Sequence, residues 1–363
     1  MFGSHLSIAG SMCNALTEAD ALGLETVQVF TKNQQQWNVK PLDPAIAREW
    51  VAGLEARGWA DRVVSHASYL INLASVQDDL WAKSIDLMTV EIERCEALGI
   101  PFLVHHPGSF VGSTLERGID RIASAYAVLM KRTAGGTTVL CLEGTAGAGS
   151  QIGGPFEHLA SLRAAILQRT GLPHRVGFCL DTCHLHAAGH DMSTREAAEA
   201  TLTAFDSACG IQHVKVLHLN DSKGKLGSHL DRHEHIGEGW VGGGAKLHAG
   251  EGTFSAAALK RSGFAAVMNH PHFRGIPKIL ETPKGVNEKG VSFDTVNLRR
   301  LRGLVAKAPG SGGTRPVPAT GRLRNLPVQE WASPWTPRPA NLRFDAPASA
   351  CWASRSPWSA GVA

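Results

Sequence analysis

The stretch GFCLDTCHLHAAG (residues 177–189) is the most informative about the fold, because it joins an apolar run to an acid, a histidine and a glycine. The apolar run has the length of a buried β-strand, and a helix that ends at the glycine can follow it. Asp181 stands where this strand would stop, and His184 follows three residues later. An isolated Asp in such a place is most simply a turn residue or a helix cap. Asp181 and His184 therefore indicate a functional site only if other predicted strands also end in such side chains.

Seven further short apolar runs occur along the chain, and nearly all of them end at a side chain that can bind a metal ion. They are FGSHLS, TVQVF, RVVSHAS, PFLVHHPGS, TTVLCLEGT, VKVLHLNDS and PKILETP. Segments of helical length and pattern separate them, such as AREWVAGLEARG and LERGIDRIASAYAVLMKR. Strands that alternate with helices are typically parallel and joined by crossovers. Eight such units predict a TIM (β/α)8 barrel, in which the chemistry lies at the C-terminal ends of the strands.

A doubly wound open sheet is the competing α/β architecture. Such a sheet binds its ligand at one switch point, whereas polar residues here follow almost every strand. In a barrel, all the C-terminal strand ends face one mouth, so the side chains that end the apolar runs would lie close together. We therefore predict a TIM barrel with a metal site at the C-terminal ends of its strands.

The candidate ligands number nine, which is more than one metal ion takes. Imidazole and carboxylate ligands together suit zinc or manganese, and each zinc ion takes about four to five of them. A carboxylate can bridge two ions, so the mouth could hold two or three ions. The candidates are His66, His106, Glu143, Asp181, His184, His218 and Glu281 at the strand ends, and Asp231 and His233 in the loop after the seventh strand.

Composition bounds the rest of the protein. The chain has 363 residues, of which 43% are hydrophobic, but it contains no apolar run that could span a bilayer and no basic-then-apolar leader at Met1. We therefore expect a cytoplasmic protein that does not associate with membranes. The seven cysteines fit no disulfide framework, and most of them are expected to be small buried thiols.

The net charge of +4 belongs to one end of the chain. Residues 310–363 hold six arginines and no lysine against Glu330 and Asp345, so residues 1–309 are formally neutral. This segment is rich in Pro, Ser, Gly and Ala, and we expect it to be a disordered extension of a barrel domain at residues 1–309. Within that domain, residues 241–253 have the composition of a loop insertion.

Three longer segments carry a resemblance to a known family. HASYLINLA (residues 66–74), GFCLDTCH (177–184) and LHLNDSKGKLGSHLDRH (217–233) resemble the signature regions of endonuclease IV, the zinc-dependent apurinic/apyrimidinic endonucleases. HPGS, LEGTAGAGS, HIGEG and ILETP match further blocks of that family in the same order. The resemblance covers residues 1–305 and leaves out the 241–253 insertion and the extension.

The resemblance implies a site for three zinc ions, with manganese as an alternative in one position. The first ion would be held by His66, His106 and Glu143. Glu143 would bridge to a second ion, which Asp181, His218 and Glu281 would also bind. The third ion would be held by His184, Asp231 and His233. Glu281 and Glu143 would also help to orient the attacking hydroxide, and His5 would support a ligand without binding an ion.

The resemblance also implies the reaction and the substrate. The enzyme would act as a monomer on double-stranded DNA, hydrolyse the phosphodiester 5′ to an abasic site, leave a 3′-hydroxyl and also remove 3′-blocking groups. Gln35, Tyr69 and Leu70 would enter the duplex beside the lesion. The sequence departs from the family at two places: Gln35 stands where Arg is common, and Ala67 stands where an acid is often found.

Two alternatives remain open at this point. A divalent-metal sugar isomerase would use a similar barrel, but it needs a pair of metals and leaves Asp231 and His233 without a role. A lesion-binding protein without cleavage would result if the 241–253 insertion blocked the third ion. Metal content separates the nuclease from the lesion-binding protein. The nuclease needs about three zinc ions per chain, whereas the lesion-binding protein would hold two or fewer.

Overall fold

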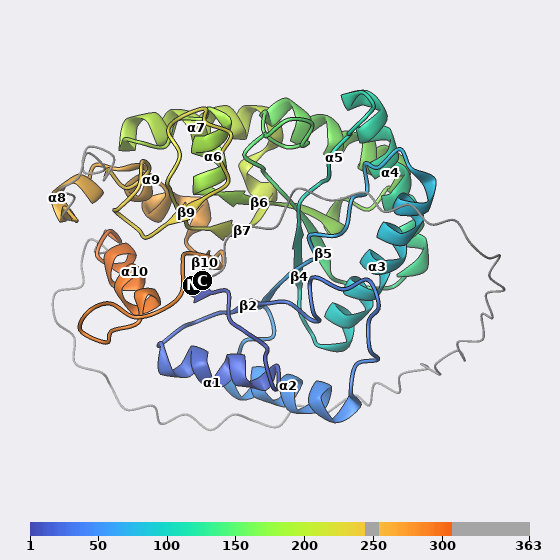
Figure 1. Ribbon diagram of the computed structural model, residues 1–363, viewed down its shortest axis with the longest axis horizontal. Helices are drawn as coiled ribbons and strands as arrows, with labels where there is room; N and C mark the ends of the chain where they lie inside the picture. The colour runs from blue at the N-terminus through green and yellow to red at the C-terminus, as the bar shows by residue number, and fades with distance from the viewer. Residues whose placement is uncertain (244–253, 307–363) are drawn as a thin grey trace, which may run out of the picture. The chain divides into compact units, whose positions relative to one another are not determined.

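The computed structural model describes residues 1–243 and 254–306, and eight parallel strands form its centre (Figure 1). They are β1 (Phe2–Ser4), β2 (Gln28–Val29), β3 (Val64–His66), β4 (Phe102–His105), β5 (Val139–Glu143), β6 (Val176–Asp181), β7 (Val214–His218) and β10 (Lys278–Leu280). From β2 onward, each strand pairs with the next of these in the chain, and β10 pairs with β1. A parallel bridge between His5 and Gln28 joins β1 to β2 and completes the ring. The prediction of a TIM barrel is confirmed.

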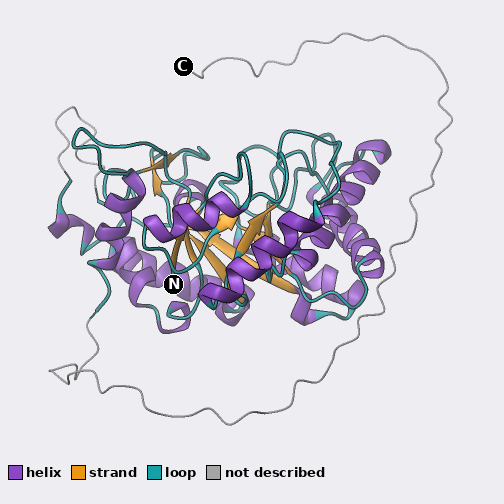
Figure 2. Cartoon of the chain, turned by 90° about the horizontal axis from the view of Figure 1, so that it is seen from below, coloured by secondary structure: helices purple, strands orange, loops and turns teal. Residues whose placement is uncertain are grey.

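Helices connect the strands and surround them (Figure 2). They are α1 (Cys13–Ala21), α2 (Pro44–Arg57), α3 (Asp78–Ala97), α4 (Leu115–Arg132), α5 (Phe156–Thr170), α6 (Thr182–Ala188), α7 (Arg195–Cys209), α8 (Ala256–Leu259), α9 (Gly263–Asn269) and α10 (Phe293–Arg302), with the 3₁₀ turns η1 (Pro173–Arg175), η2 (Ile211–His213) and η4 (Pro271–Phe273). The hydroxyls of Thr114 and Thr194 cap α4 and α7. Gly58 ends α2 in the left-handed conformation, as the sequence predicts. None of the helices in the described ranges combines the length and apolar character needed to cross a membrane.

Two apolar layers stabilise the barrel. The larger layer lies between the strands and the helices, and the smaller one fills the interior of the barrel with one side chain from each of six strands. The interior residues are Val64, Val104, Cys141, Cys179, Val216 and Ile279. Side chains on a strand alternate between its two faces, so the next inward residue follows two positions later. Those next residues are His66, His106, Glu143, Asp181, His218 and Glu281, which places six candidate ligands directly above the interior core.

A short hairpin was not anticipated by the sequence. β8 (Asp221–Ser222) pairs in antiparallel fashion with β9 (His233–Glu234), and together they bring the loop that carries Asp231 and His233 back to the barrel. The fully buried Asp221 carboxylate accepts hydrogen bonds from the backbone N–H groups of Gly237, Val241 and Gly242. The start of the 241–253 segment is thus tied to the barrel, whereas residues 244–253 and the expected extension at 310–363 lie outside the described residues.

The cysteines of the described ranges agree with the expectation of buried thiols. Six of them are free, and all of these except Cys13 are buried.

Candidate metal centre

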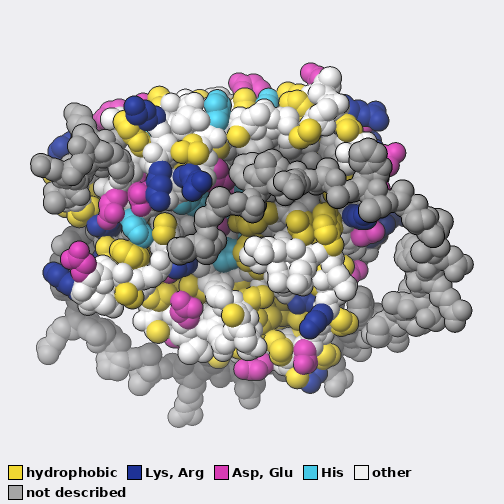
Figure 3. Space-filling model, in the orientation of Figure 1, with side chains coloured by type: hydrophobic (Ala, Val, Ile, Leu, Met, Phe, Trp, Pro, Cys, Tyr) yellow, Lys and Arg dark blue, Asp and Glu magenta, His cyan; other side chains and the backbone are white. Residues whose placement is uncertain are grey.

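A cavity of about 370 Å³ opens at the C-terminal ends of the strands. Seven of the nine candidate ligands line it, namely His66, His106, Glu143, His184, Asp231, His233 and Glu281. The remaining two, Asp181 and His218, are completely buried. Histidine side chains reach the surface on the face shown in Figure 3. The structure therefore brings together all nine residues that the sequence singles out.

Glu143 occupies the centre of this group with a side chain that is only 1% exposed. Its Oε2 lies 3.1 Å from Nε2 of His66 and 3.3 Å from Nε2 of His106. Its Oε1 lies 2.9 Å from Nδ1 of His218. The two carboxylate oxygens thus face two different sets of imidazoles, which suits a carboxylate shared between two cations.

Asp181 has two roles at the end of β6. Its Oδ1 accepts hydrogen bonds from the backbone N–H groups of Cys183 and His184 and so caps α6. Its Oδ2 faces the cavity side, 3.6 Å from Nε2 of His233 and 4.0 Å from Nδ1 of His218. Asp181 is therefore a helix cap, as its position after a strand suggests. Its second oxygen, Oδ2, faces the other candidate ligands and remains available to bind a metal ion.

His184 and His233 converge on Asp231. The distances from Oδ1 of Asp231 to Nε2 of His184 and Nε2 of His233 are 3.0 and 3.5 Å. Neither contact has the geometry of a hydrogen bond, so both buried nitrogens lack a hydrogen-bond partner among the described residues. Buried polar atoms are normally satisfied, so this arrangement of imidazole and carboxylate fits a cation as the shared partner. Asp181 can also serve this group, because its carboxylate lies within 4.8 Å of both imidazoles.

The buried charges shift one another's pKa. Burial by itself would lower the pKa of His218, but the carboxylates of Glu281 and Glu143 outweigh it and raise the pKa to about 9. Burial would raise the pKa of Asp231, but the neighbouring His184 lowers it to about 2. A proton on His218 therefore balances part of the carboxylate charge, and a bound cation would take its place.

One further group near the centre is not suited to this role. Cys179 lies close to Glu143 and His218. Its side chain is part of the apolar interior of the barrel, and burial raises the pKa of its thiol well above the usual value.

Backbone carbonyls orient three of the imidazoles. Nδ1 of His66, His184 and His233 lies 2.8, 2.9 and 3.2 Å from the carbonyl oxygens of Ala67, Gly144 and Glu281. Each Nδ1–H donates to its carbonyl, which leaves Nε2 free to bind at the centre. The contact of His66 uses the backbone of Ala67, so the absence of an acidic side chain there does not remove it.

Sequence reasoning missed two residues of the site. Asn220 donates to Oδ2 of Asp181 at 2.7 Å and accepts from the backbone N–H of Glu281 at 2.8 Å. Gln28 contacts both Glu281 and His218. Asn220 stands in the run VKVLHLNDS two residues after His218, but Gln28 lies inside an apolar run, where only the period-two alternation of β2 marks it as inward-facing.

The candidate DNA-contact residues lie at the rim. Tyr69 is 61% exposed, and its ring centroid lies 5.3 and 5.8 Å from those of His66 and His106. Gln35 is exposed, whereas Leu70 is partly buried and packs against the main core. The hydroxyl of Ser68 donates to the carbonyl of Gln34 at 2.5 Å and so joins the two loops.

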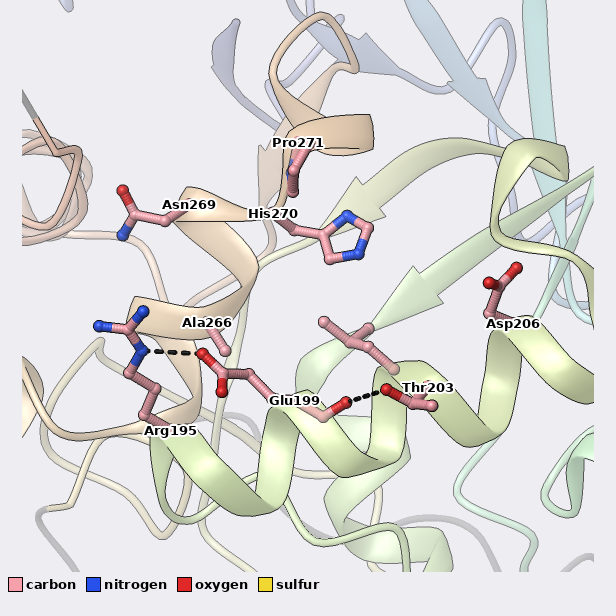
Figure 4. Close-up of a pocket in the computed structure, with 9 residues that line it drawn as sticks. Arg195, Glu199, Thr203, Asp206, Ala266, Asn269, His270 and Pro271 are labelled. Carbon is pink, nitrogen blue, oxygen red and sulfur yellow. Dashed lines mark hydrogen bonds and ion pairs between the residues drawn. The ribbon is translucent and has the colours of Figure 1, made fainter. Parts of the chain in front are cut away.

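A second cavity, of about 320 Å³, lies on the helical exterior (Figure 4). Residues of α7, α9 and η4 line it, and three of its polar residues are paired with one another. Arg195 donates to the Glu199 carboxylate at 2.8 Å, and the Thr203 hydroxyl donates to the Glu199 carbonyl. This cavity gathers no group of possible metal ligands among the described residues, in contrast to the mouth.

Comparisons with known proteins agree with this geometry. A family model described as "Xylose isomerase-like TIM barrel" matches residues 16–292. "Probable endonuclease 4" of Chloroflexus aurantiacus is 40% identical over 307 residues, which cover 85% of this chain and 99% of the relative. The protein of the same name from Citrifermentans bemidjiense is also 40% identical, over 84% of this chain and 99% of its own length.

Solved structures also include an endonuclease IV among the proteins similar to this chain. The crystal structure of endonuclease IV from Thermus thermophilus is 36% identical, with a TM-score of 0.66, and the match covers 84% of this chain and 98% of that one. A D-tagatose 3-epimerase-like protein matches with a TM-score of 0.58 at 16% identity, which shows a shared fold alone.

Proposed function

The chain belongs to the endonuclease IV family, and we propose that it is a DNA repair endonuclease that hydrolyses the phosphodiester 5′ to an abasic site in double-stranded DNA and leaves a 3′-hydroxyl. The observation that supports this most directly is the convergence of nine imidazole and carboxylate side chains on one cavity. Removal of 3′-blocking groups is the same phosphodiester hydrolysis at the 3′ end of a DNA strand, and we include it in the proposal. We expect the protein to act as a monomer.

The proposed cofactor is zinc, with three ions per chain and manganese as an alternative in one position. His66, His106 and Glu143 would hold the first ion, and Glu143, Asp181, His218 and Glu281 the second. His184, Asp231 and His233 would hold the third. When bound, such ions supply positive charge to phosphate oxygens and make water acidic enough to act as a nucleophile near neutral pH.

The protein's own side chains would position the attacking water, the metal ligands and the DNA. The Glu281 side chain is 13% exposed, less buried than Glu143 or Asp181, and it lies on the cavity wall, where it can hold the attacking water by a hydrogen bond. Glu143 fixes the spacing of the imidazoles around it. Tyr69 and Gln35, both exposed, would contact the duplex at the lesion, where a missing base makes the nucleotide easier to turn out of the helix. Leu70 is expected to assist as part of the same loop.

A sugar isomerase is the weaker alternative. The epimerases that share the fold are too distant to carry a function. Asp231 and His233 reach the cavity from the loop after β7, and they give the mouth more ligands than a two-metal sugar site needs.

The test is cleavage of a labelled duplex with one abasic analogue, before and after removal of metal by a chelator and after restoration of zinc. We expect one cut on the 5′ side of the lesion, dependent on about three zinc ions per chain. Glu281→Gln should keep the fold and most of the DNA affinity but lose cleavage by at least about 100-fold. Glu196→Gln, at an exposed position of α7, is the matched control and should cleave normally.

The outcomes separate the candidates. Near-normal cleavage by Glu281→Gln would contradict the role of that carboxylate. Tight binding to the abasic duplex without any cut, at full zinc content, would favour a lesion-binding protein instead of a nuclease.

A further inference from the structure

Each strand of the barrel places one inward side chain at the level of the mouth. On six strands this residue is a candidate metal ligand two positions after the interior core residue. On β1 and β2 the corresponding residues are His5 and Gln28, which are paired in the parallel bridge that closes the barrel. Gln28 is completely buried although it is a polar amide. A polar side chain in this position needs partners, and it finds them in the metal centre.

Gln28 makes three contacts with residues of the site. Its Nε2 lies 2.6 Å from Oε1 of Glu281 and 2.9 Å from Nδ1 of His5. Its Oε1 lies 2.8 Å from Nε2 of His218. The amide therefore bridges two of the four candidate ligands of the second ion.

The chemistry of these partners fixes the orientation of the amide and the tautomer of the imidazole. An ionised carboxylate can only accept, so the amide nitrogen must face Glu281. The amide oxygen then faces Nε2 of His218, which must carry the proton. When an ion binds, Nδ1 of His218 would give up its proton and offer its lone pair on the side where Glu143 and Glu281 lie at 2.9 and 3.2 Å.

His218 differs in this respect from three other imidazoles of the centre. His66, His184 and His233 would bind through Nε2, and each is held by a backbone carbonyl that no side-chain substitution removes. His218 faces the centre with Nδ1 instead, and a side chain holds its other nitrogen. Its tautomer therefore depends on the identity of residue 28.

We propose that Gln28 is a positioning residue that holds His218 in the tautomer required for metal binding and aims Glu281 at the second ion. This inference rests on the proposed three-ion centre. Partners of metal ligands typically change metal affinity by about 10–100-fold when they are removed. Loss of the Gln28 amide should therefore weaken one of the three ions selectively, because the other imidazoles keep their carbonyl contacts.

The test uses two substitutions at this position. Gln28→Met keeps the length of the side chain but removes both hydrogen bonds to the ligands. Gln28→Glu keeps an acceptor for His218 but sets a second carboxylate against Glu281. Gln168→Ala, at an exposed position of α5, is the control glutamine. The measurements are zinc content per chain, the rate of zinc release to a competing chelator, and thermal melting of the zinc-free proteins.

We expect the wild type and Gln168→Ala to hold about three zinc ions. Gln28→Met should release one of them about 10–100-fold faster, with unchanged melting of the zinc-free form and with cleavage recovered by excess zinc. Gln28→Glu should also release one ion faster, and it provides the readout if Gln28→Met does not fold. Zinc release at the wild-type rate from the folded variants would overturn the inference, whereas a wild type without zinc would overturn the proposed metal centre itself.

Discussion

Glu91 on α3 joins the two loops that carry the candidate DNA contacts, and its removal should loosen both of them. The Thr31 hydroxyl donates to its Oε2 at 3.0 Å, and the backbone N–H of Ser68 donates to its Oε1 at 3.2 Å. Nζ of Lys32 lies 3.3 Å from the same Oε1, and the Lys32 and Glu91 side chains are only 5% and 1% exposed. Glu91→Gln leaves the size of the side chain almost unchanged but removes the counter-charge of a buried ammonium.

The expected cost follows from that burial. Removing one partner of a buried ion pair typically costs about 3–5 kcal/mol, because the other charge stays buried and unpaired. Lys32 retains a hydrogen bond to the carbonyl of Asn33 at 3.2 Å, which favours the lower end. We therefore expect Glu91→Gln to lower the free energy of unfolding by about 3 kcal/mol. The double variant Glu91→Gln/Lys32→Met should recover much of this loss.

Urea denaturation of the zinc-loaded protein measures the free energy of unfolding of each variant. The affinity for an abasic duplex shows whether the two loops still contact DNA. Glu93→Gln, at an exposed position of the same helix, is the control and should change neither quantity. Affinity for the duplex should fall in Glu91→Gln while zinc content stays the same. The reasoning is refuted if Glu91→Gln loses less than about 1 kcal/mol, or if the double variant is no more stable than the single one.

Two further predictions concern the rim and the hairpin. Tyr69→Ala should weaken binding to the abasic duplex by about 1–3 kcal/mol, the range for aromatic contacts with bases, and leave zinc content unchanged. Val111→Ala, which is 69% exposed in the wild type, serves as the control in the same binding titration. Asp221→Asn should destabilise the protein by about 1–3 kcal/mol, because the amide nitrogen cannot accept the backbone N–H groups that the carboxylate accepts. Urea denaturation checks this value, and an unchanged free energy of unfolding would contradict the role of the carboxylate as an anchor.

The barrel and the group of candidate ligands could be predicted from the sequence because both follow from one pattern. Short apolar runs that end in His, Asp or Glu predict parallel strands, and the barrel then brings those ends together. GFCLDTCH shows the pattern most clearly, since Asp181 ends β6 and also caps α6. The nine residues could be chosen without knowing any distance between them.

The remaining features depend on contacts between distant parts of the chain. Gln28 lies 190 residues from His218 and 253 from Glu281, and a glutamine in an apolar run is not a usual metal ligand. Lys32 is polar and follows β2, so nothing local indicates that it is buried beside Glu91. β8 and β9 contain two residues each, which is too short for any periodicity to be recognised. Their pairing follows from the return of the loop to the barrel.

The two parts of the metal centre depend on the fold in different ways. Six candidate ligands follow the interior core residues by two positions, so a shift of any strand by one residue would turn its ligand away from the mouth. Asp231 and His233 have no such constraint, because they belong to the loop that the β8–β9 hairpin and the Asp221 carboxylate hold in place. Substitutions in the interior core should therefore disturb all the ions together with the fold. Substitutions in the hairpin should instead affect the third proposed ion while the barrel remains intact.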